Sequence, residues 1–163
     1  VQRPDPVMFL RYWNNETATR EKFIGDWLVT GDTGAMDVDG YVHFVGRADD
    51  VITSAGYRIG PGEIEDCILQ HPAVQLVTVV GAPDPQRTEV VVAVVVVKDG
   101  VSADDALARS IQEHVKVRLA AHEYPREVYF AAELPMTTTG KVIRRQVRQQ
   151  VQAWRAQQTG KPA

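Results

Sequence analysis

The sequence has one cysteine, few aromatic residues and no long apolar run. The single Cys67 excludes an internal disulfide and favours a reducing compartment, so we expect a cytoplasmic protein. No stretch is long and apolar enough to predict a membrane span, and residues 1–4 lack the pattern of a signal peptide. The net charge is only −3, which gives no electrostatic reason to expect a nucleic-acid partner.

The composition that remains is ordinary for a globular protein, with 44% hydrophobic and 24% charged residues in a chain of 163. This length suffices for one good core, or for one domain together with a piece of another. The first residue is Val1 rather than Met, so we expect the sequence to be part of a longer protein.

Residues 1–48 predict the end of an incomplete domain. Strand-like runs at 27–30 and 41–45 flank residues 37–40, Asp-Val-Asp-Gly, which are typical of a hairpin turn. Residues 17–23 are a short helix candidate. Two strands alone are marginally stable in water, so this segment is not expected to fold by itself.

Residues 49–163 predict a complete small domain with three helices. Pro61 begins the first helix, as expected for a proline at the first helical position. Ser102 and Asp105, in a near capping-box arrangement, begin the second, and the third follows Gly140.

Three strands are expected in the same domain, at residues 76–80, 90–97 and 128–131. The run 90–97 is apolar at every position, which is typical of a central strand buried on both faces. The mixed order of helices and strands predicts an α+β fold, in which helices flank a central sheet of about three strands.

Two longer stretches and one triplet carry a family resemblance. Residues 46–65 read G-R-A-D-D-V-I-T-S-A-G-Y-R-I-G-P-G-E-I-E, and residues 134–145 read L-P-M-T-T-T-G-K-V-I-R-R. Together with the triplet Thr30-Gly31-Asp32, they resemble the adenylate-forming enzymes: acyl- and aryl-CoA synthetases, luciferases and peptide-synthetase adenylation domains. The resemblance implies that residues 1–48 end a large N-terminal AMP-binding domain and that residues 49–163 form the C-terminal domain.

The resemblance implies roles for three residues near the domain boundary. Asp32 would accept hydrogen bonds from both ribose hydroxyls of ATP, since a carboxylate offers two acceptor oxygens. Arg47 would reach the ribose and phosphate side of the nucleotide, and Asp49 would be the hinge about which the C-terminal domain turns. Without the resemblance, all three also fit as ordinary turn or surface residues.

Lys141 is the catalytic residue that the resemblance implies. When a carboxylate attacks the α-phosphorus of ATP, negative charge builds up, and a positioned ammonium group lowers that barrier. A Walker A loop would need glycine in place of Pro135 and serine or threonine in place of Val142, so a P-loop is excluded.

Gly56, Tyr57 and Arg58 match the family loop that faces coenzyme A. Glycine would let the pantetheine arm pass close to the backbone, and an arginine can pair with a CoA phosphate. The four histidines show no metal-ligand spacing, so we interpret them as structural or solvent-facing and expect no metal site among them. Mg²⁺ would bind together with ATP, as its complex.

Residues 54–61 are similar to the S-x-G-Y-R-I-G-P segment of medium-chain acyl-CoA synthetases. This implies an acid–thiol ligase that converts a fatty or aryl acid, ATP and CoA to acyl-CoA, AMP and pyrophosphate through acyl-AMP. The alternatives are a benzoate-type aryl-CoA ligase, an adenylation domain that loads a carrier protein, and a non-catalytic interaction domain of the same fold. The phosphate loop and acyl pocket of the family would lie in the missing N-terminal domain, so we expect the fragment alone to be inactive.

Overall fold

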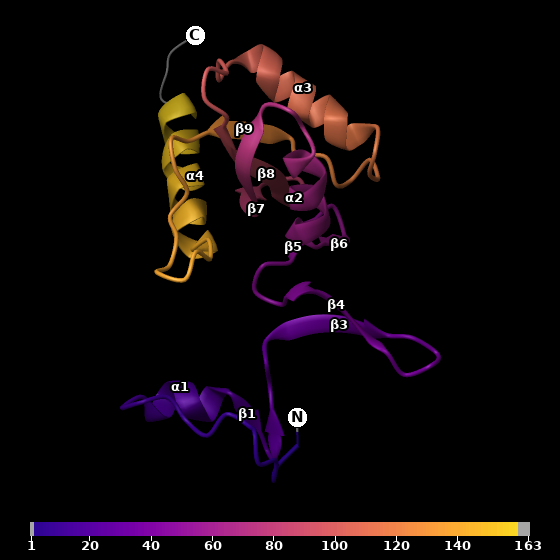
Figure 1. Ribbon diagram of the computed structural model, residues 1–163, viewed down its shortest axis with the longest axis vertical. Coiled ribbons are helices and arrows are strands. Elements are labelled where there is room, and N and C mark those ends of the chain that lie inside the picture. Colours follow the sequence, from indigo (N-terminus) through magenta and orange to yellow (C-terminus); the bar gives the residue numbers. More distant parts are fainter. Residues whose placement is uncertain (1, 160–163) are drawn as a thin grey trace. The chain divides into compact units, whose positions relative to one another are not determined.

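A computed structural model describes residues 2–159 and divides the chain into two compact units, Val1–Asp49 and Asp50–Ala163 (Figure 1). The boundary falls between Asp49 and Asp50, next to the predicted hinge residue. No helix in the described range is long and apolar enough to cross a membrane.

The first unit consists of one short helix and two separate hairpins. Its elements are α1 (Glu16–Glu21), β1 (Phe23–Ile24), β2 (Trp27–Leu28), β3 (Asp32–Met36) and β4 (Val42–Arg47). The predicted turn at residues 37–40 is confirmed, because the Asp37 side chain accepts backbone hydrogen bonds from Asp39 and Tyr41. The predicted pairing of residues 27–30 with residues 41–45 is wrong. β4 pairs with β3, and β2 pairs with β1.

None of the residues in this unit whose burial is described is buried. Large apolar side chains lie open to solvent instead, among them Trp13, Met36, Val38, Tyr41 and Phe44. The unit therefore has two hairpins without a hydrophobic core between them.

The second unit contains a five-stranded sheet in the order β6-β5-β8-β7, with β9 beside β8. The strands are β5 (Ile52–Ser54), β6 (Tyr57–Ile59), β7 (Val74–Asp84), β8 (Thr88–Val97) and β9 (Glu127–Phe130). β7 and β8 form a long antiparallel hairpin, whereas β9 runs parallel to β8. The short β5 and β6 extend the sheet beyond the three strands expected, and they place Tyr57 and Arg58 on a strand rather than in a loop.

Helices cover both faces of this sheet. α2 (Pro61–Leu69) and α3 (Asp105–Lys116) pack on one face, where alternate β8 residues such as Val91 and Val95 are buried. α4 (Arg144–Thr159) packs on the other face, against Val92 and Val94. The all-apolar run in β8 is thereby explained, and the predicted α+β fold is confirmed.

The helix starts agree only in part with the sequence-based expectation. Pro61 is the first residue of α2, as predicted. The N-cap of α3 is Asp104 rather than Ser102, because the Asp104 carboxylate accepts a hydrogen bond from the Leu107 amide at 2.9 Å. A carboxylate in this position also favours the positive end of the helix dipole.

Candidate functional site

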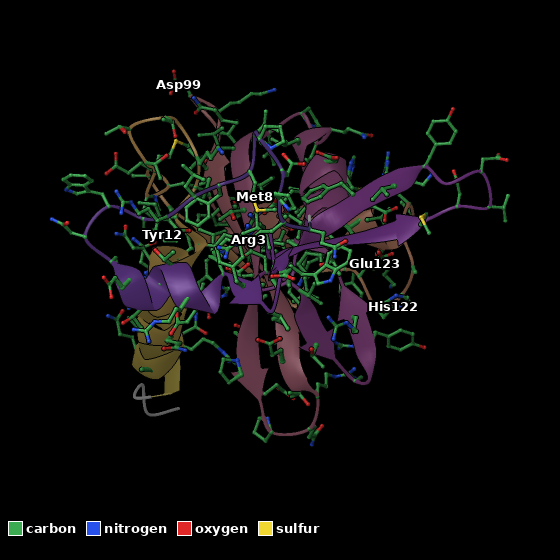
Figure 2. All side chains as sticks on the ribbon, turned by 90° about the horizontal axis from the view of Figure 1, so that it is seen from below. Arg3, Met8, Tyr12, Asp99, His122 and Glu123 are labelled. Atoms are coloured by element: carbon green, nitrogen blue, oxygen red, sulfur yellow. The ribbon has the colours of Figure 1, made fainter. Side chains whose placement is uncertain are left out.

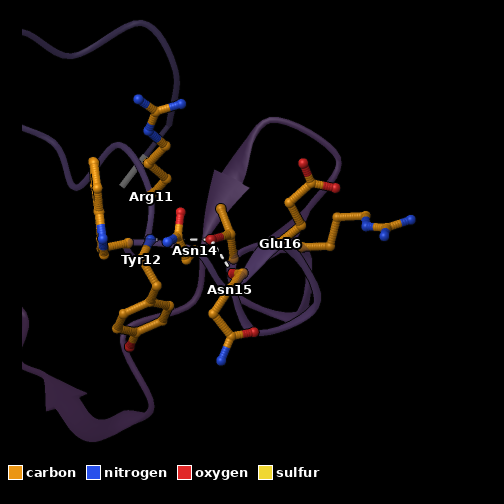
Figure 3. Close-up of a pocket in the computed structure, with 8 residues that line it drawn as sticks. Arg11, Tyr12, Asn14, Asn15 and Glu16 are labelled. Atoms are coloured by element: carbon orange, nitrogen blue, oxygen red, sulfur yellow. Dashed lines mark hydrogen bonds between the residues drawn. The ribbon is translucent and has the colours of Figure 1, made fainter.

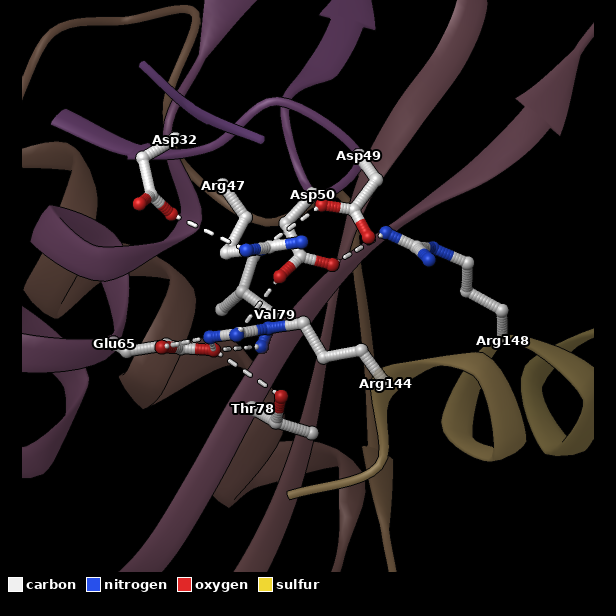
Figure 4. A network of polar contacts seen from close by, with 9 residues as sticks. All are labelled: Asp32, Arg47, Asp49, Asp50, Glu65, Thr78, Val79, Arg144 and Arg148. Atoms are coloured by element: carbon white, nitrogen blue, oxygen red, sulfur yellow. Dashed lines mark hydrogen bonds and ion pairs between the residues drawn. The ribbon is translucent and has the colours of Figure 1, made fainter. Parts of the chain in front are cut away.

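The β3–β4 hairpin brings Asp32, Arg47 and Asp49 together (Figure 4). Asp32 and Arg47 are directly paired residues at the open end of the hairpin, with an Nη1 to Oδ1 distance of 3.3 Å. Arg47 Nε also lies 3.2 Å from Asp49 Oδ1, and its Nη1 donates to the Thr30 carbonyl. Three residues predicted separately along the sequence thus form one exposed charged cluster.

The charge of Asp49 makes the largest contribution to a raised pKa of Arg47, and the charge of Asp32 adds to it. The guanidinium is nevertheless largely accessible, with 43% of its side chain exposed. It can therefore exchange part of this pairing for hydrogen bonds to an anionic ligand such as a phosphate.

Lys141 lies on a hydrogen-bonded turn between Pro135 and Ile143, the Lys141 turn, which precedes α4. The Thr137 amide donates to the Lys141 carbonyl at 2.8 Å, and the Lys141 amide donates to Thr137 Oγ1 at 3.1 Å. Gly140 has a φ of +78°, a backbone conformation that glycine adopts without strain. Lys141 is exposed, and within residues 2–159 its ammonium group takes part in no ion pair.

A pocket of about 220 Å³ lies beside Tyr57 in the second unit. The Tyr57 ring stacks on His122, with 4.0 Å between ring centroids and 10° between planes. His122 belongs to the segment between α3 and β9 (Figure 2). The other residues that line the pocket are Ser54, Ala55, Arg87, Val91, Ala121, Tyr124 and Arg126. Two guanidinium groups and several aromatic rings thus meet in one small cavity.

The structure separates two of the residues predicted to face CoA. Tyr57 lines the pocket, but Arg58 does not, since neighbouring residues of β6 point to opposite faces of the sheet. Gly56 occupies the turn between β5 and β6 with a φ of +85°. The cations that line the cavity are Arg87 and Arg126, for which no role was predicted from the sequence.

The predicted structural role of the histidines fits His71 and His114. His71 Nε2 lies 3.1 Å from Ser110 Oγ, and its Nδ1 accepts from the Ala73 amide. His114 Nε2 lies 3.1 Å from the Cys67 carbonyl oxygen. Across the described residues, no group of three or more His, Cys, Asp or Glu side chains could hold a metal ion.

A second pocket, of about 500 Å³, lies in the first unit and is lined only by residues of the contiguous segment 11–20 (Figure 3). Asn15 caps α1 there, accepting a hydrogen bond from the Ala18 amide at 3.0 Å. The lining contains no cluster of catalytic groups, so we assign this pocket no function.

Part of the chain matches a known enzyme family, and most of it is similar to known proteins. Residues 63–141 match the AMP-binding enzyme C-terminal domain. Acyl-coenzyme A synthetase ACSM2, a mitochondrial protein of Rattus norvegicus, is 47% identical over 143 residues, which cover 86% of this chain and 25% of the relative. The chain therefore spans about a quarter of the length of the curated relatives it matches.

Solved structures, one of them a CoA ligase, share the fold. The anthranilate CoA ligase AuaEII, in complex with anthranoyl-AMP, matches with a TM-score of 0.76 and 40% identity over 86% of this chain and 27% of its own. ATP-bound MatB from Rhodopseudomonas palustris matches with a TM-score of 0.74 and 33% identity, again over 86% of this chain and 27% of its own. The resemblance recognised in the sequence is confirmed.

Proposed function

We propose that this chain, which carries the C-terminal domain of the AMP-binding enzymes, is the C-terminal part of an ATP-dependent acyl-CoA synthetase. The observation that carries the proposal is the 47% identity to an acyl-coenzyme A synthetase over 86% of the chain. The complete enzyme would join a carboxylic acid to CoA in two steps, and a large N-terminal domain, absent from this chain, would be its main partner.

In the first step, the acid's carboxylate attacks the α-phosphorus of ATP, and pyrophosphate leaves to give acyl-AMP. Lys141 would stabilise the negative charge that develops, since its exposed ammonium group is not engaged in an ion pair within the described range. Asp32 and Arg47 would bind the nucleotide: the carboxylate would accept from the ribose hydroxyls, and the guanidinium would turn to the phosphate side.

In the second step, the CoA thiolate attacks the acyl carbonyl, and AMP leaves. Gly56 and Tyr57 would border the path of the pantetheine arm, as the family resemblance implies. We assign the anionic end of CoA to Arg87 and Arg126, because these two cations line the cavity next to Tyr57, whereas Arg58 lies on the opposite face of β6. A phosphate between two guanidinium groups would make charge-assisted hydrogen bonds with both.

Mg²⁺ is expected to accompany ATP. Residues 2–159 present no group of acidic, histidine or cysteine side chains that fits a metal ion, so we assign no residue of this chain to Mg²⁺. We expect a cytoplasmic location from the single cysteine, although the curated relative named above is mitochondrial. Fractionation of the source cells tests the location directly.

The experiment that tests the proposal uses the full-length protein. ATP–pyrophosphate exchange should depend on added acid, and CoA should then convert the acyl-AMP to a thioester. A panel of straight-chain acids and benzoate separates the medium-chain enzyme, which we favour, from an aryl-CoA ligase. Transfer to a carrier protein but not to CoA would contradict the synthetase, and absence of any acid-dependent exchange would favour a non-catalytic interaction domain.

A further inference from the structure

A network of partly buried charges involves Arg144 and Arg148 at the start of α4 (Figure 4). Arg144 Nη2 donates to both carboxylate oxygens of Glu65, at 2.8 and 2.6 Å. Its Nη1 donates to Asp50 Oδ2 at 3.2 Å, and Arg148 Nη2 donates to the other oxygen of Asp50 at 2.9 Å. The side chains of Asp50 and Glu65 are only 12% and 15% exposed, so these contacts are much less screened than surface ion pairs.

Glu65 is itself fixed to the central sheet. Its Oε1 also accepts from the Val79 amide at 2.8 Å and from Thr78 Oγ1 at 3.1 Å. Burial opposes the charge on Arg144, but its hydrogen bonds and charge interactions with Glu65 and Asp50 raise its pKa, so it stays ionised. The guanidinium thus joins α4 to the sheet through Glu65 and to the first residue of the second unit through Asp50.

The Lys141 turn ends where this network begins. The Ile143 amide donates to the Pro135 carbonyl at 2.8 Å, which closes the base of the turn one residue before Arg144. Lys141 itself is exposed, and its backbone forms hydrogen bonds with the backbone and the side chain of Thr137. The position of the lysine relative to Asp50 therefore depends on how firmly the first turn of α4 is anchored.

We propose that Arg144 is a positioning residue that fixes the Lys141 turn to the sheet and to Asp50, so that the lysine moves as one body with the residues that follow the hinge. The part of this proposal that concerns catalysis rests on the proposed function. The adenylation step requires the ammonium group to reach a defined point, because small displacements of a catalytic group reduce rates strongly. An anchor that joins the hinge end of the domain to the lysine turn meets this requirement.

The first test uses the 163-residue chain and needs no activity. Amide hydrogen exchange measured by NMR should show that Thr137 and Ile143 exchange about tenfold faster or more in Arg144→Met, because the anchor of their turn is lost. The matched control is Arg145→Met, since Arg145 is the exposed neighbour of Arg144 and, within the described structure, takes no part in the network. Core amides of Val92 to Val95 report whether each variant remains folded.

If Arg144→Met loses protection in the core, Arg144→Lys takes its place, since it keeps the charge but cannot hold both carboxylates in the same fork. Faster exchange confined to the turn supports the proposal. Unchanged exchange at Thr137 and Ile143 in a folded Arg144 variant overturns it.

The second test measures the two half-reactions of the full-length enzyme. In the Arg144 variant that folds, kcat for acyl-AMP formation should fall by about tenfold or more, with KM for ATP and for the acid nearly unchanged. Conversion of supplied acyl-AMP to acyl-CoA should be retained. Equal loss in both half-reactions would show a general structural role and overturn the positioning role. A wild-type enzyme without acyl-AMP formation would instead refute the proposed function, while hydrogen exchange would still decide how the turn is held.

Discussion

Lys141 and Arg144 are cations three residues apart, but their surroundings differ. Arg144 is tied to two carboxylates, whereas the Lys141 ammonium extends from an exposed turn and has no ion-pair partner in the described structure. A cation without a partner in its own chain is available for a ligand that carries negative charge, such as the triphosphate of ATP. A cation such as Arg144, which is held by the carboxylates of Asp50 and Glu65, contributes to the structure instead.

Replacing Lys141 tests this distinction. In the full-length enzyme, Lys141→Ala should reduce acyl-AMP formation by about 10²–10³-fold, the usual effect of removing one group that stabilises transition-state charge. Conversion of supplied acyl-AMP to acyl-CoA should be largely spared, and Arg145→Ala should affect neither step. Separate assays of the half-reactions give the answer, and equal losses in both would show that Lys141 is mainly structural.

His71 gives a prediction for pH dependence. The pKa of His71 is lowered, chiefly by burial and further by the neighbouring His114 and Arg118. As the pH is lowered, His71 is therefore protonated near pH 6.5 in the unfolded chain but only at a lower pH in the folded chain. The stability that depends on neutral His71 is complete above about pH 6.5 and is lost as the pH falls from there through the lower pKa of the folded state.

The measurement is urea denaturation of the chain between pH 7.5 and 5.5, compared with that of His71→Asn. The asparagine can still accept from the Ala73 amide but cannot titrate. In the window where only the unfolded form is protonated, the free energy of unfolding of the wild type should fall by up to about 1.4 kcal/mol per pH unit more than that of the variant. Parallel pH profiles would mean that His71 does not contribute.

At the residue scale, the sequence indicated individual residues but not which of them lie together. Asp32 and Arg47 were predicted from separate motifs, and the register of β3 and β4 places them side by side. Arg87, His122 and Arg126 could not be assigned to Tyr57 from the sequence. They meet because β5 joins β8 at a single residue pair and the segment after α3 returns to the same edge of β8, which is a property of the folded sheet.

Among the elements, the β5–β6 hairpin offers the sharpest test of local structure. Ser54 pairs with Tyr57, so Ala55 and Gly56 form a two-residue turn, and both have positive φ angles, of 50° and 85°. Type I′ turns require this conformation and prefer Asn-Gly, whereas alanine is strained there by about 1–2 kcal/mol. Gly56 is therefore needed for the turn itself, whether or not pantetheine passes beside it.

Ala55→Asn should raise the free energy of unfolding by up to about 1 kcal/mol, because asparagine tolerates the left-handed conformation better than alanine. Ala55→Ser is the control, since serine gains little in this conformation. Chemical denaturation of both variants measures the effect. A loss of stability in the asparagine variant would contradict the turn assignment.

The strength of local patterns decided which elements could be predicted. The apolar run of β8 and the proline at the start of α2 gave the correct strand and helix, because one feature dominated each stretch. β5 and β6 were not expected, since three-residue strands show almost no periodicity and pair mainly through the turn between them. The start of α3 was placed two residues too early, because Ser102 and Asp104 are both good caps and only the fold selects between them.

The two units of the molecule differ in the burial of their apolar residues. The second unit encloses two apolar clusters, one on each face of its sheet, whereas the described residues of the first enclose none. Amide hydrogen exchange of the chain should therefore find residues 2–49 weakly protected and the amides of β7 and β8 strongly protected. Strong protection of the first unit would mean that its exposed apolar residues have found a partner, such as a second copy of the chain.

The boundary between the units allows the domain-rotation mechanism to be tested by one substitution. A domain that must adopt two orientations needs a few residues that absorb a large change in φ and ψ. Asp49 is the last residue of the first unit, directly before the anchored Asp50. Proline at this position would fix φ near −65° and restrict Ala48 before it. If that φ suits the adenylating orientation, Asp49→Pro in the full-length enzyme should retain acyl-AMP synthesis and lose transfer to CoA.

Asp49→Ala controls for the lost carboxylate, including its ion pair with Arg47, while leaving the backbone free. It should retain both half-reactions, at rates within about tenfold of the wild type. Assaying acyl-AMP synthesis and thioester formation separately in the two variants isolates the effect of the backbone restriction. Normal overall turnover in the proline variant would mean that no rotation about Asp49 is needed, and the hinge would then have to be sought elsewhere in the chain.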